Sequence, residues 1–191
     1  MPRAYVRTKI VKSMKNSLTP IKISMFDFFD GNGPVQAHRH TNLNGTLGGW
    51  IASTAIVDPT VYLAENCVVY GNARVLESVE VSGNSKIYGD ALVFGSSRVW
   101  GNSEVYERAM IYNHAWIDGN AHVCGSARVF GHAQVEDNAV ITDCAIVRGD
   151  SEVFENAVIN GCAEISGRAN IGGNKIVSTG KITGEEEPYD L

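Results

Sequence analysis

The sequence of 191 residues contains only 5 Pro and 4 Cys, and it has no acidic residue before Asp27. No apolar run approaches the ~20 residues of a membrane-spanning helix, and the basic start lacks the continuous apolar stretch of a signal peptide. The cysteines, Cys67, Cys124, Cys144 and Cys162, include no C-x-x-C pair, so reduced thiols are expected. These absences predict a cytoplasmic protein that does not enter a membrane.

Charge is distributed unevenly along the chain. All 21 Asp and Glu residues lie at or after Asp27, whereas six of the 16 Lys and Arg residues lie at or before Lys22. The part of the chain that follows Lys22 therefore carries 10 basic and 21 acidic side chains, a net charge of −11. Because a body with this charge repels phosphate backbones, we expect no nucleic-acid partner.

Glycine is abundant, with 20 in the chain, and 12 of these recur in phase at a spacing of six. With Gly as position 1, position 5 is Val, Ile or Leu in 22 consecutive hexads from Ile51 to Val177, and position 3 is Gly, Ala, Ser or Cys in 19 of them. Positions 3 and 5 lie on the same side of a strand. Each hexad therefore predicts a short strand with a small and an aliphatic residue facing inward, preceded by a corner at positions 1 and 2.

A second period, three hexads long, indicates that three hexads close one coil. Position 2 of every third hexad is Asn, in a column of seven residues. The column is Asn66, Asn84, Asn102, Asn120, Asn138, Asn156 and Asn174. We interpret it as a structural ladder at one corner, since Asn tolerates positive φ and stacked amides hydrogen-bond to each other. The sequence thus predicts an all-β parallel β-helix solenoid of about seven 18-residue coils.

The repeat divides the chain into three parts. Residues 1–46 precede the repeat, residues 47–183 form the predicted β-helix, and residues 184–191 form an acidic C-terminal tail. In the first part, a turn sequence at residues 30–33 separates two segments of alternating polarity, which predicts a β-hairpin. We expect this hairpin to cap the first coil, because an uncovered coil end exposes strand edges.

The hexads resemble those of the hexapeptide-repeat acyltransferase superfamily, and this resemblance implies a left-handed β-helix and a homotrimer. The segment Gly45-Thr46-Leu47-Gly48-Gly49-Trp50, followed by hexads such as Gly71 to Val75, is similar to the YdcK-like proteins of bacteria and phages. Members of that branch are described as transferases without an assigned substrate. The resemblance covers about 70% of the chain and implies a fold far more specifically than a chemistry.

The outward positions 4 and 6 sort onto three faces. One face carries an apolar set, and a second carries a column of tyrosines. The apolar set is Leu76, Leu92, Phe94, Met110, Tyr112, Phe130 and Ile146, and the tyrosine column is Tyr70, Tyr88 and Tyr106. A contiguous apolar patch is typical of an interface, so we expect a homotrimer to assemble through the first face. The alternative is that the aromatic columns only stabilise stacked strands.

Histidines are the candidate catalytic residues. His114 and His132 lie three hexads apart at position 2, which stacks them at one corner, and His122 lies between them in sequence. Such a pair could transfer protons or bind a metal, or it could be two exposed corner residues. The fold also resembles the hexapeptide carbonic anhydrases, which implies zinc bound by three His, two of them five residues apart. The spacings here are eight, ten and 18, so no metal site is expected.

Two functions remain open. The first is a non-catalytic trimeric scaffold or binding module that needs no cofactor and holds a small molecule or a protein in its subunit grooves. The second, implied by the superfamily resemblance, is an acyl-CoA-dependent transferase with a His general base and an unknown small acceptor. We favour the first, because the extruded loop that frequently flanks the catalytic His in that superfamily has no counterpart within the 22 hexads.

Overall fold

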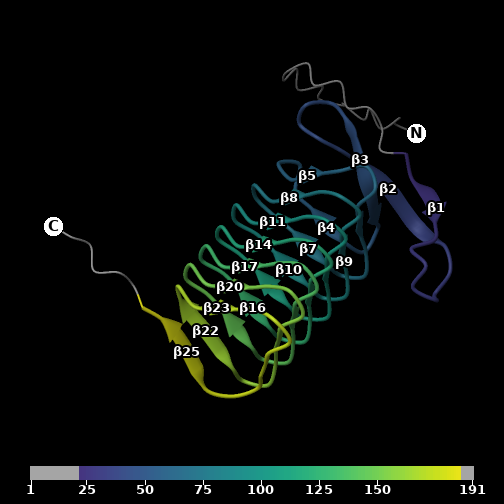
Figure 1. Cartoon of the computed structure of the whole chain (residues 1–191). Helices are drawn as coiled ribbons and strands as arrows, with labels where there is room; N and C mark the ends of the chain where they lie inside the picture. The colour runs from purple at the N-terminus through teal and green to yellow at the C-terminus, as the bar shows by residue number, and fades with distance from the viewer. Residues whose placement is uncertain (1–21, 186–191) are drawn as a thin grey trace, which may run out of the picture.

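The structure, a computed structural model, describes residues 22–185 and is a three-sided parallel β-helix (Figure 1). Neighbouring coils pair in register at an 18-residue offset, as Val93 does with Ile111. The predicted all-β class, the parallel coils and the N-terminal hairpin are confirmed. Within residues 22–185, no helix has the length and apolarity that a membrane crossing requires.

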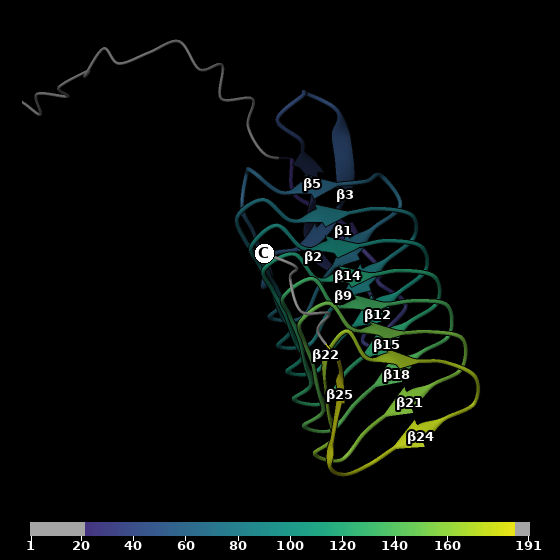
Figure 2. The same cartoon turned by 60° about the vertical axis from the view of Figure 1, so that its left-hand side comes forward.

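Three sheets form the sides of the solenoid, and we call them faces A, B and C. Face A, whose strands are seen stacked in Figure 2, contains β1 (Ser24–Phe26), β2 (Val35–Thr41), β3 (Leu47–Ala52), β6 (Val68–Val69), β9 (Lys86–Ile87), β12 (Glu104–Val105), β15 (His122–Val123), β18 (Val140–Ile141), β21 (Val158–Ile159) and β24 (Ile176–Val177). Face B contains β4 (Ile56–Val57), β7 (Arg74–Val75), β10 (Leu92–Val93), β13 (Met110–Ile111), β16 (Arg128–Val129), β19 (Ile146–Val147), β22 (Glu164–Gly167) and β25 (Lys181–Gly184). Face C contains β5 (Tyr62–Leu63), β8 (Glu80–Val81), β11 (Arg98–Val99), β14 (Trp116–Ile117), β17 (Gln134–Val135), β20 (Glu152–Val153) and β23 (Asn170–Ile171).

The number of coils slightly exceeds the number that the hexads predict. From β3 onward the three faces hold eight, eight and seven parallel strands, so seven coils are complete and two strands of another bring the solenoid to about eight turns. The additional strand is β25, which follows the last hexad. It pairs with β22 in a register that places Glu164 opposite Lys181, so the last coil is one residue shorter than the others.

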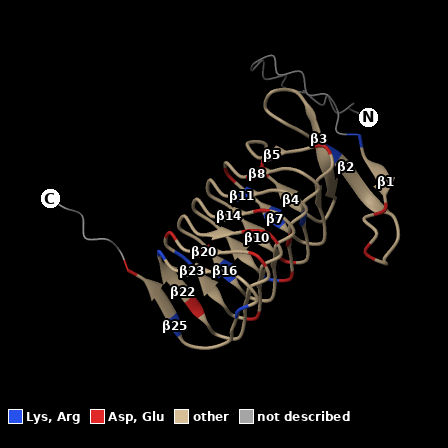
Figure 3. Cartoon of the chain, in the orientation of Figure 1, with Lys and Arg blue, Asp and Glu red and all other residues tan. Residues whose placement is uncertain are grey.

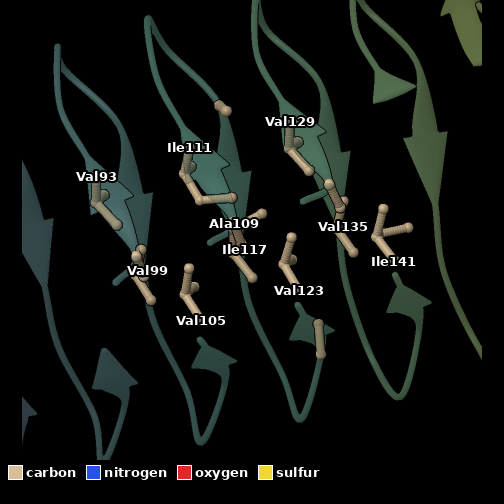
Figure 4. Close-up of a cluster of buried hydrophobic side chains, with 14 of the residues drawn as sticks. Val93, Val99, Val105, Ala109, Ile111, Ile117, Val123, Val129, Val135 and Ile141 are labelled. Atoms are coloured by element: carbon tan, nitrogen blue, oxygen red, sulfur yellow. The ribbon is translucent and has the colours of Figure 1, made fainter. Parts of the chain in front are cut away.

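The interior is one continuous stack of small and aliphatic side chains (Figure 4). Position-5 residues such as Val105, Ile111 and Ile117 are fully buried, and position-3 residues such as Ala109 lie beside them. Burying one such aliphatic side chain contributes roughly 1.5–3 kcal/mol. Because every coil repeats this arrangement, the core fixes the outward side chains in columns with an 18-residue spacing.

The conformation of the corners explains the in-phase glycines and the placement of several acidic residues, which are red in Figure 3. All 12 in-phase glycines have positive φ. Five corners instead carry an acidic residue with positive φ, and each carboxylate accepts a hydrogen bond from the backbone N–H of the residue 18 positions later. These residues are Glu77, Glu107, Asp137, Asp143 and Glu155. Each of these acids therefore adds a coil-to-coil hydrogen bond that offsets the strain of its backbone conformation.

The predicted asparagine column forms a hydrogen-bonded ladder along the corner between faces C and A. From Asn84 to Asn174, each Nδ2 donates to the Oδ1 of the next Asn, over 2.8–3.1 Å. Asn66 lies in the same column but has no side-chain hydrogen bond within the described residues. The ladder is exposed and joins successive coils, which is the structural role that the sequence predicts. The expected positive φ is wrong, however, because none of these asparagines has one, so the hydrogen bonds between stacked amides account for the column.

The N-terminal hairpin extends face A beyond the first coil. β1 pairs antiparallel with β2, and β2 pairs antiparallel with β3. Aromatic rings fix this arrangement, because Phe26 stacks on Trp50 at 4.5 Å and Phe28 stacks on Tyr70 at 4.9 Å. The hairpin thus covers the first edge of face A and buries the start of the tyrosine column.

Two buried side chains at the end of β2, His40 within the strand and Asn42 just after it, close the first edge of face C. The Asn42 amide accepts a hydrogen bond from the Leu63 N–H at 2.8 Å and donates to the Leu63 carbonyl at 3.1 Å. His40 Nε2 donates to the Val61 carbonyl at 2.8 Å. In an inner coil, the equivalent backbone groups pair with the preceding coil. Asn42 and His40 therefore replace a missing strand at the open end of the solenoid.

Candidate functional site

The stacked histidines lie at the corner between faces B and C. The His114 and His132 rings are within 10° of parallel, with centroids 4.9 Å apart, and both side chains are exposed. Each follows a corner residue with positive φ, Asn113 or Gly131, so the same local geometry presents both imidazoles. The 18-residue period therefore brings these two candidate residues together.

A shallow hollow of about 330 Å³ surrounds the two imidazoles and spans three coils of face C. Two columns with an 18-residue spacing line it, one at position 2 and one at position 4. The position-2 column is Ser96, His114 and His132, and the position-4 column is Arg98, Trp116 and Gln134. The hollow combines aromatic surface, a guanidinium, two imidazoles, a hydroxyl and an amide, so it offers several kinds of contact to one ligand.

Arg98 is the permanent positive charge of this hollow. Its guanidinium lies 5.7 Å from the Trp100 ring and 6.0 Å from the Trp116 ring, both distances at which cation–π attraction acts. The two indoles meet edge to face, and neither Nε1–H has a hydrogen-bond partner within the described residues although both are shielded from solvent. An acceptor such as a carboxylate or phosphate would therefore complement the groups gathered here.

The hollow lacks the partners that general-base catalysis usually needs within one chain. Among residues 22–185, no carboxylate hydrogen-bonds to the ring of His114 or His132, and no group of three His, Cys, Asp or Glu residues is placed to hold a metal ion. A catalytic imidazole is normally oriented by such a partner. Within the described residues, neither imidazole therefore has a hydrogen-bonded carboxylate that would orient it.

His122 is separate from this hollow. It belongs to β15 on face A, where its ring meets Tyr106 edge to face at 6.3 Å, and it pairs in register with Glu104 of β12. The third candidate histidine is therefore part of the tyrosine column and does not lie with the stacked pair.

The tyrosine column forms a stack with one charged neighbour. Tyr70, Tyr88 and Tyr106 are within 2° of parallel, with neighbouring centroids 4.8 and 4.9 Å apart, and Tyr70 is only 8% exposed because Phe28 covers it. Tyr88 donates a hydrogen bond to Glu104 at 2.9 Å.

The environment of this column raises the pKa of all three tyrosines and lowers the pKa of the neighbouring Glu104. Burial raises the pKa of Tyr70 to about 12, and burial together with the bond to Glu104 raises the pKa of Tyr88. Burial alone would raise the pKa of Glu104, but hydrogen bonds from Lys86 and Tyr88 outweigh it and lower that pKa. These phenols are therefore protonated structural groups at neutral pH.

The apolar set on face B is also ordered in columns, and we call it the apolar stripe. Phe94, Tyr112 and Phe130 stack with centroids 5.0 and 4.7 Å apart. Leu92 and Met110 pair in register beside them, and all of these side chains are half-buried. The stacked rings shield one another's faces, but their outer edges form a continuous apolar surface.

Sequence reasoning identified the histidines of the hollow but missed its other column. Arg98, Trp116 and Gln134 also lie one coil apart, so a joint reading of positions 2 and 4 would have revealed the hollow. Comparison with protein-family models gave no match, and neither did comparison with curated proteins.

Proposed function

We propose that this chain is a left-handed hexapeptide-repeat β-helix of the YdcK-like branch that forms a homotrimer in the cytoplasm. In this proposal it acts as a non-catalytic scaffold or binding module, with a small molecule or a protein held where subunits meet. It needs no cofactor for this role. The left-handed sense, the branch and the trimer come from the resemblance of the hexads to that superfamily.

The observation that carries self-association is the continuity of the apolar stripe. Its position-6 side chains run without interruption over four successive coils of face B and are only half-buried in the single chain; they are Leu76, Phe94, Tyr112 and Phe130. At position 4 the exposed Arg128 separates Met110 from Ile146. Stacking within the chain accounts for the contact between ring faces, but it leaves the ring edges uncovered. Contiguous apolar surface of this kind is typical of subunit interfaces, so a second copy of the chain is the expected occupant.

The assembly is tested by adding charge to the stripe. The double substitution Phe94→Glu and Phe130→Glu should convert the oligomer to a monomer in light scattering, while circular dichroism retains the β signal. A matched control, Val140→Glu with Val158→Glu, adds the same charge to half-buried positions on face A and should leave the oligomer intact. An unchanged oligomer in the first variant would contradict assembly through face B.

A second candidate, acyl transfer from acyl-CoA, is favoured by one observation. The hollow with His114 and His132 lies at the corner where face B ends, so a neighbour seated on face B would border it. Arg98 offers charge to coenzyme phosphates, and an imidazole could take the proton of the acceptor. Turnover with acetyl-CoA by the wild type, and its loss in His114→Ala, would support this candidate. Binding of acetyl-CoA without any turnover would favour the binding module.

A further inference from the structure

Two cysteines lie in contact on the corner between faces A and B. Cys144 and Cys162 occupy position 2 of successive coils, and their Sγ atoms are 3.3 Å apart. Both side chains are exposed and both thiols are free, whereas Cys67 and Cys124 are buried. The coils therefore hold one accessible thiol pair and leave the other two cysteines out of reach of solvent.

We infer that Cys144 and Cys162 are a modification site at which a low-molecular-weight disulfide closes a reversible disulfide bond between adjacent coils. This inference does not depend on the proposed function. Adjacent coils are spaced by about 4.8 Å, which lies within the usual Cα separation of about 4.4–6.8 Å for a disulfide. The sulfurs need only approach from 3.3 Å to about 2.05 Å.

The exposure of the pair explains why the bond is reversible. Both cysteines lie at the surface of the corner, so a small thiol can reach a bond between them. Exposed disulfides are among the ones that thiols reduce readily. The pair is therefore suited to alternate between dithiol and disulfide rather than to form a permanent link.

The chemistry is two successive thiol–disulfide exchanges. The thiolate of Cys144 attacks one sulfur of the small disulfide, forming a mixed disulfide and releasing one small thiolate. The thiolate of Cys162 then attacks the Cys144 sulfur and releases the second small thiolate. The protein gives up two protons and two electrons, and the small disulfide takes up both to become two thiols.

The surroundings of the pair indicate which disulfides approach it best. An open groove runs along this corner to Cys144 and is lined by the carboxylates of Asp90, Glu107 and Asp143 and by the guanidinium of Arg108. The excess of negative charge favours a cationic reagent over an anionic one. The hydrogen bond with Cys162 raises the pKa of the Cys144 thiol, and the Asp143 carboxylate adds to this effect, so the exchange accelerates as pH rises.

The position of the pair gives the bond a structural consequence. Cys144 follows β18 and Cys162 follows β21, and only four strands, β22 to β25, come after Cys162 in the solenoid. A bond between them closes a loop that spans one coil next to the open C-terminal end and restricts separation of these coils. We expect oxidation to slow amide hydrogen exchange in β21 and β22 by about tenfold.

The test treats the full-length protein with cystamine, a cationic disulfide, and then alkylates the unfolded product with iodoacetamide. The wild type should lose two hydrogens in mass, take up two alkyl groups in place of four, and yield a peptide that links Cys144 to Cys162. Single variants Cys144→Ser and Cys162→Ser should instead retain one cysteamine adduct. Addition of dithiothreitol should restore all four thiols and the original exchange rates.

Two results would overturn the inference. The first is a wild type that accumulates cysteamine adducts at both sites, or links other cysteines, without the bond between Cys144 and Cys162. The second is a disulfide that forms but leaves amide hydrogen exchange in β21 and β22 unchanged, which would show that the bond does not restrict separation of these coils. The buried Cys67, whose pKa burial raises to about 11, serves as the internal unreactive thiol in every sample.

Discussion

The two ends of the solenoid are closed in different ways. At the N-terminal end, β2 pairs with β3, Asn42 bonds to the edge of β5, and the inward-facing Ile51 is 2% exposed. At the C-terminal end, the inward-facing Val177 is only half-buried. There Lys175 occupies position 3, which is a small residue in most hexads, and its side chain is exposed. Hydrogen bonds therefore cap the N-terminal end, whereas the C-terminal end exposes the charged side chain of Lys175.

The difference shows two ways to protect an open strand edge. Side chains can hydrogen-bond to its unpaired backbone groups, or a charged residue can deter another strand from pairing with it. The N-terminal cap supplies partners to backbone groups that would otherwise be buried without them, so it stabilises the fold. A lysine at the C-terminal edge deters addition of another chain but gives the last coil no hydrogen bonds. We therefore expect substitutions at the N-terminal end to cost much more stability than substitutions at the C-terminal end.

The largest effect is expected for Gly49→Ala in β3. A Cβ at Gly49 would overlap the carbonyl oxygen of Cys67 and lie 2.8 Å from its carbonyl carbon, and both atoms belong to the backbone of the next coil. Neither can move without breaking the pairing of β3 with β6. The free energy of unfolding, measured by urea denaturation, should fall by about 4 kcal/mol.

The matched control is Gly180→Ala at the C-terminal end. Gly180 has a φ of 84°, so alanine there is strained, but an added Cβ meets nothing within 4 Å. The expected loss is about 1 kcal/mol. Equal losses at Gly49 and Gly180 would show that the two ends are equally tolerant and would refute the comparison.

A smaller loss is expected for Asn42→Ala. This change removes the amide that hydrogen-bonds to both the N–H and the carbonyl of Leu63. Both bonds are buried at the first edge of face C. An unpaired buried group costs about 1–3 kcal/mol, so at the lower end of that range the two groups together should lower the free energy of unfolding by about 2 kcal/mol. Hydrogen exchange of the Leu63 amide should accelerate in parallel.

The ladder residue Asn156 gives the comparison for this prediction. Its amide also bonds to a neighbouring coil, but the side chain is exposed and water replaces the lost partner. Asn156→Ala should therefore cost about 0.5 kcal/mol. If both substitutions cost the same, the amide of Asn42 acts as an ordinary surface contact and not as a cap.

The two ends should also respond to acid in different pH ranges. Burial lowers the pKa of His40 and of His38, although the bond to Val61 opposes this for His40. Protonation therefore favours the unfolded cap, whose stability is complete above about pH 6.5 and falls below it. At the other end, the hydrogen bond from Arg148 lowers the pKa of Glu164, so its contribution persists above about pH 4.3 and is lost below.

Lowering the pH from 7 to 5 should consequently weaken the N-terminal end alone. Exchange of β2 amides, corrected for the intrinsic rate, should accelerate by about tenfold, while exchange in β25 stays constant. His40→Gln keeps a donor for the Val61 carbonyl and removes the titrating group, so it should flatten most of the response. A wild type with the same β2 protection at both pH values would contradict the prediction.

The fold was predictable because its information is periodic. The inward aliphatic residues from Ile51 to Val177 and the Asn column place every strand from β3 to β24 without knowledge of the coordinates. The cap was not predictable in detail, because Asn42 acts on a residue 21 positions away through a side-chain amide that has no periodic signal. The shorter last coil was not predictable either, because β25 follows the last hexad and so lies outside the periodic pattern.

The candidate site was predictable only in part, for a related reason. The period aligns His114 with His132, but it does not determine how Arg98 turns between Trp100 and Trp116. Such contacts depend on side-chain rotamers, which are set by local packing. The acidic corners were predictable in part. The sequence shows Asp or Glu at positions where other hexads have Gly, but it does not show the hydrogen bond from each carboxylate to the next coil.

The smallest effect is expected for the ion pairs of the two ends. Glu164 contacts Arg148 at 2.7 Å and Lys181 at 3.3 Å, and it joins β25 to the last coils. All three side chains are partly exposed, so Glu164→Gln should cost about 0.5 kcal/mol at low salt and nothing measurable in 1 M NaCl. At the N-terminal end, Glu65 contacts Arg39 at 3.3 Å but is 74% exposed, and Glu65→Gln should have no effect in either condition. If Glu65→Gln proved the more costly of the two in urea denaturation, charge as well as hydrogen bonding would hold the N-terminal cap.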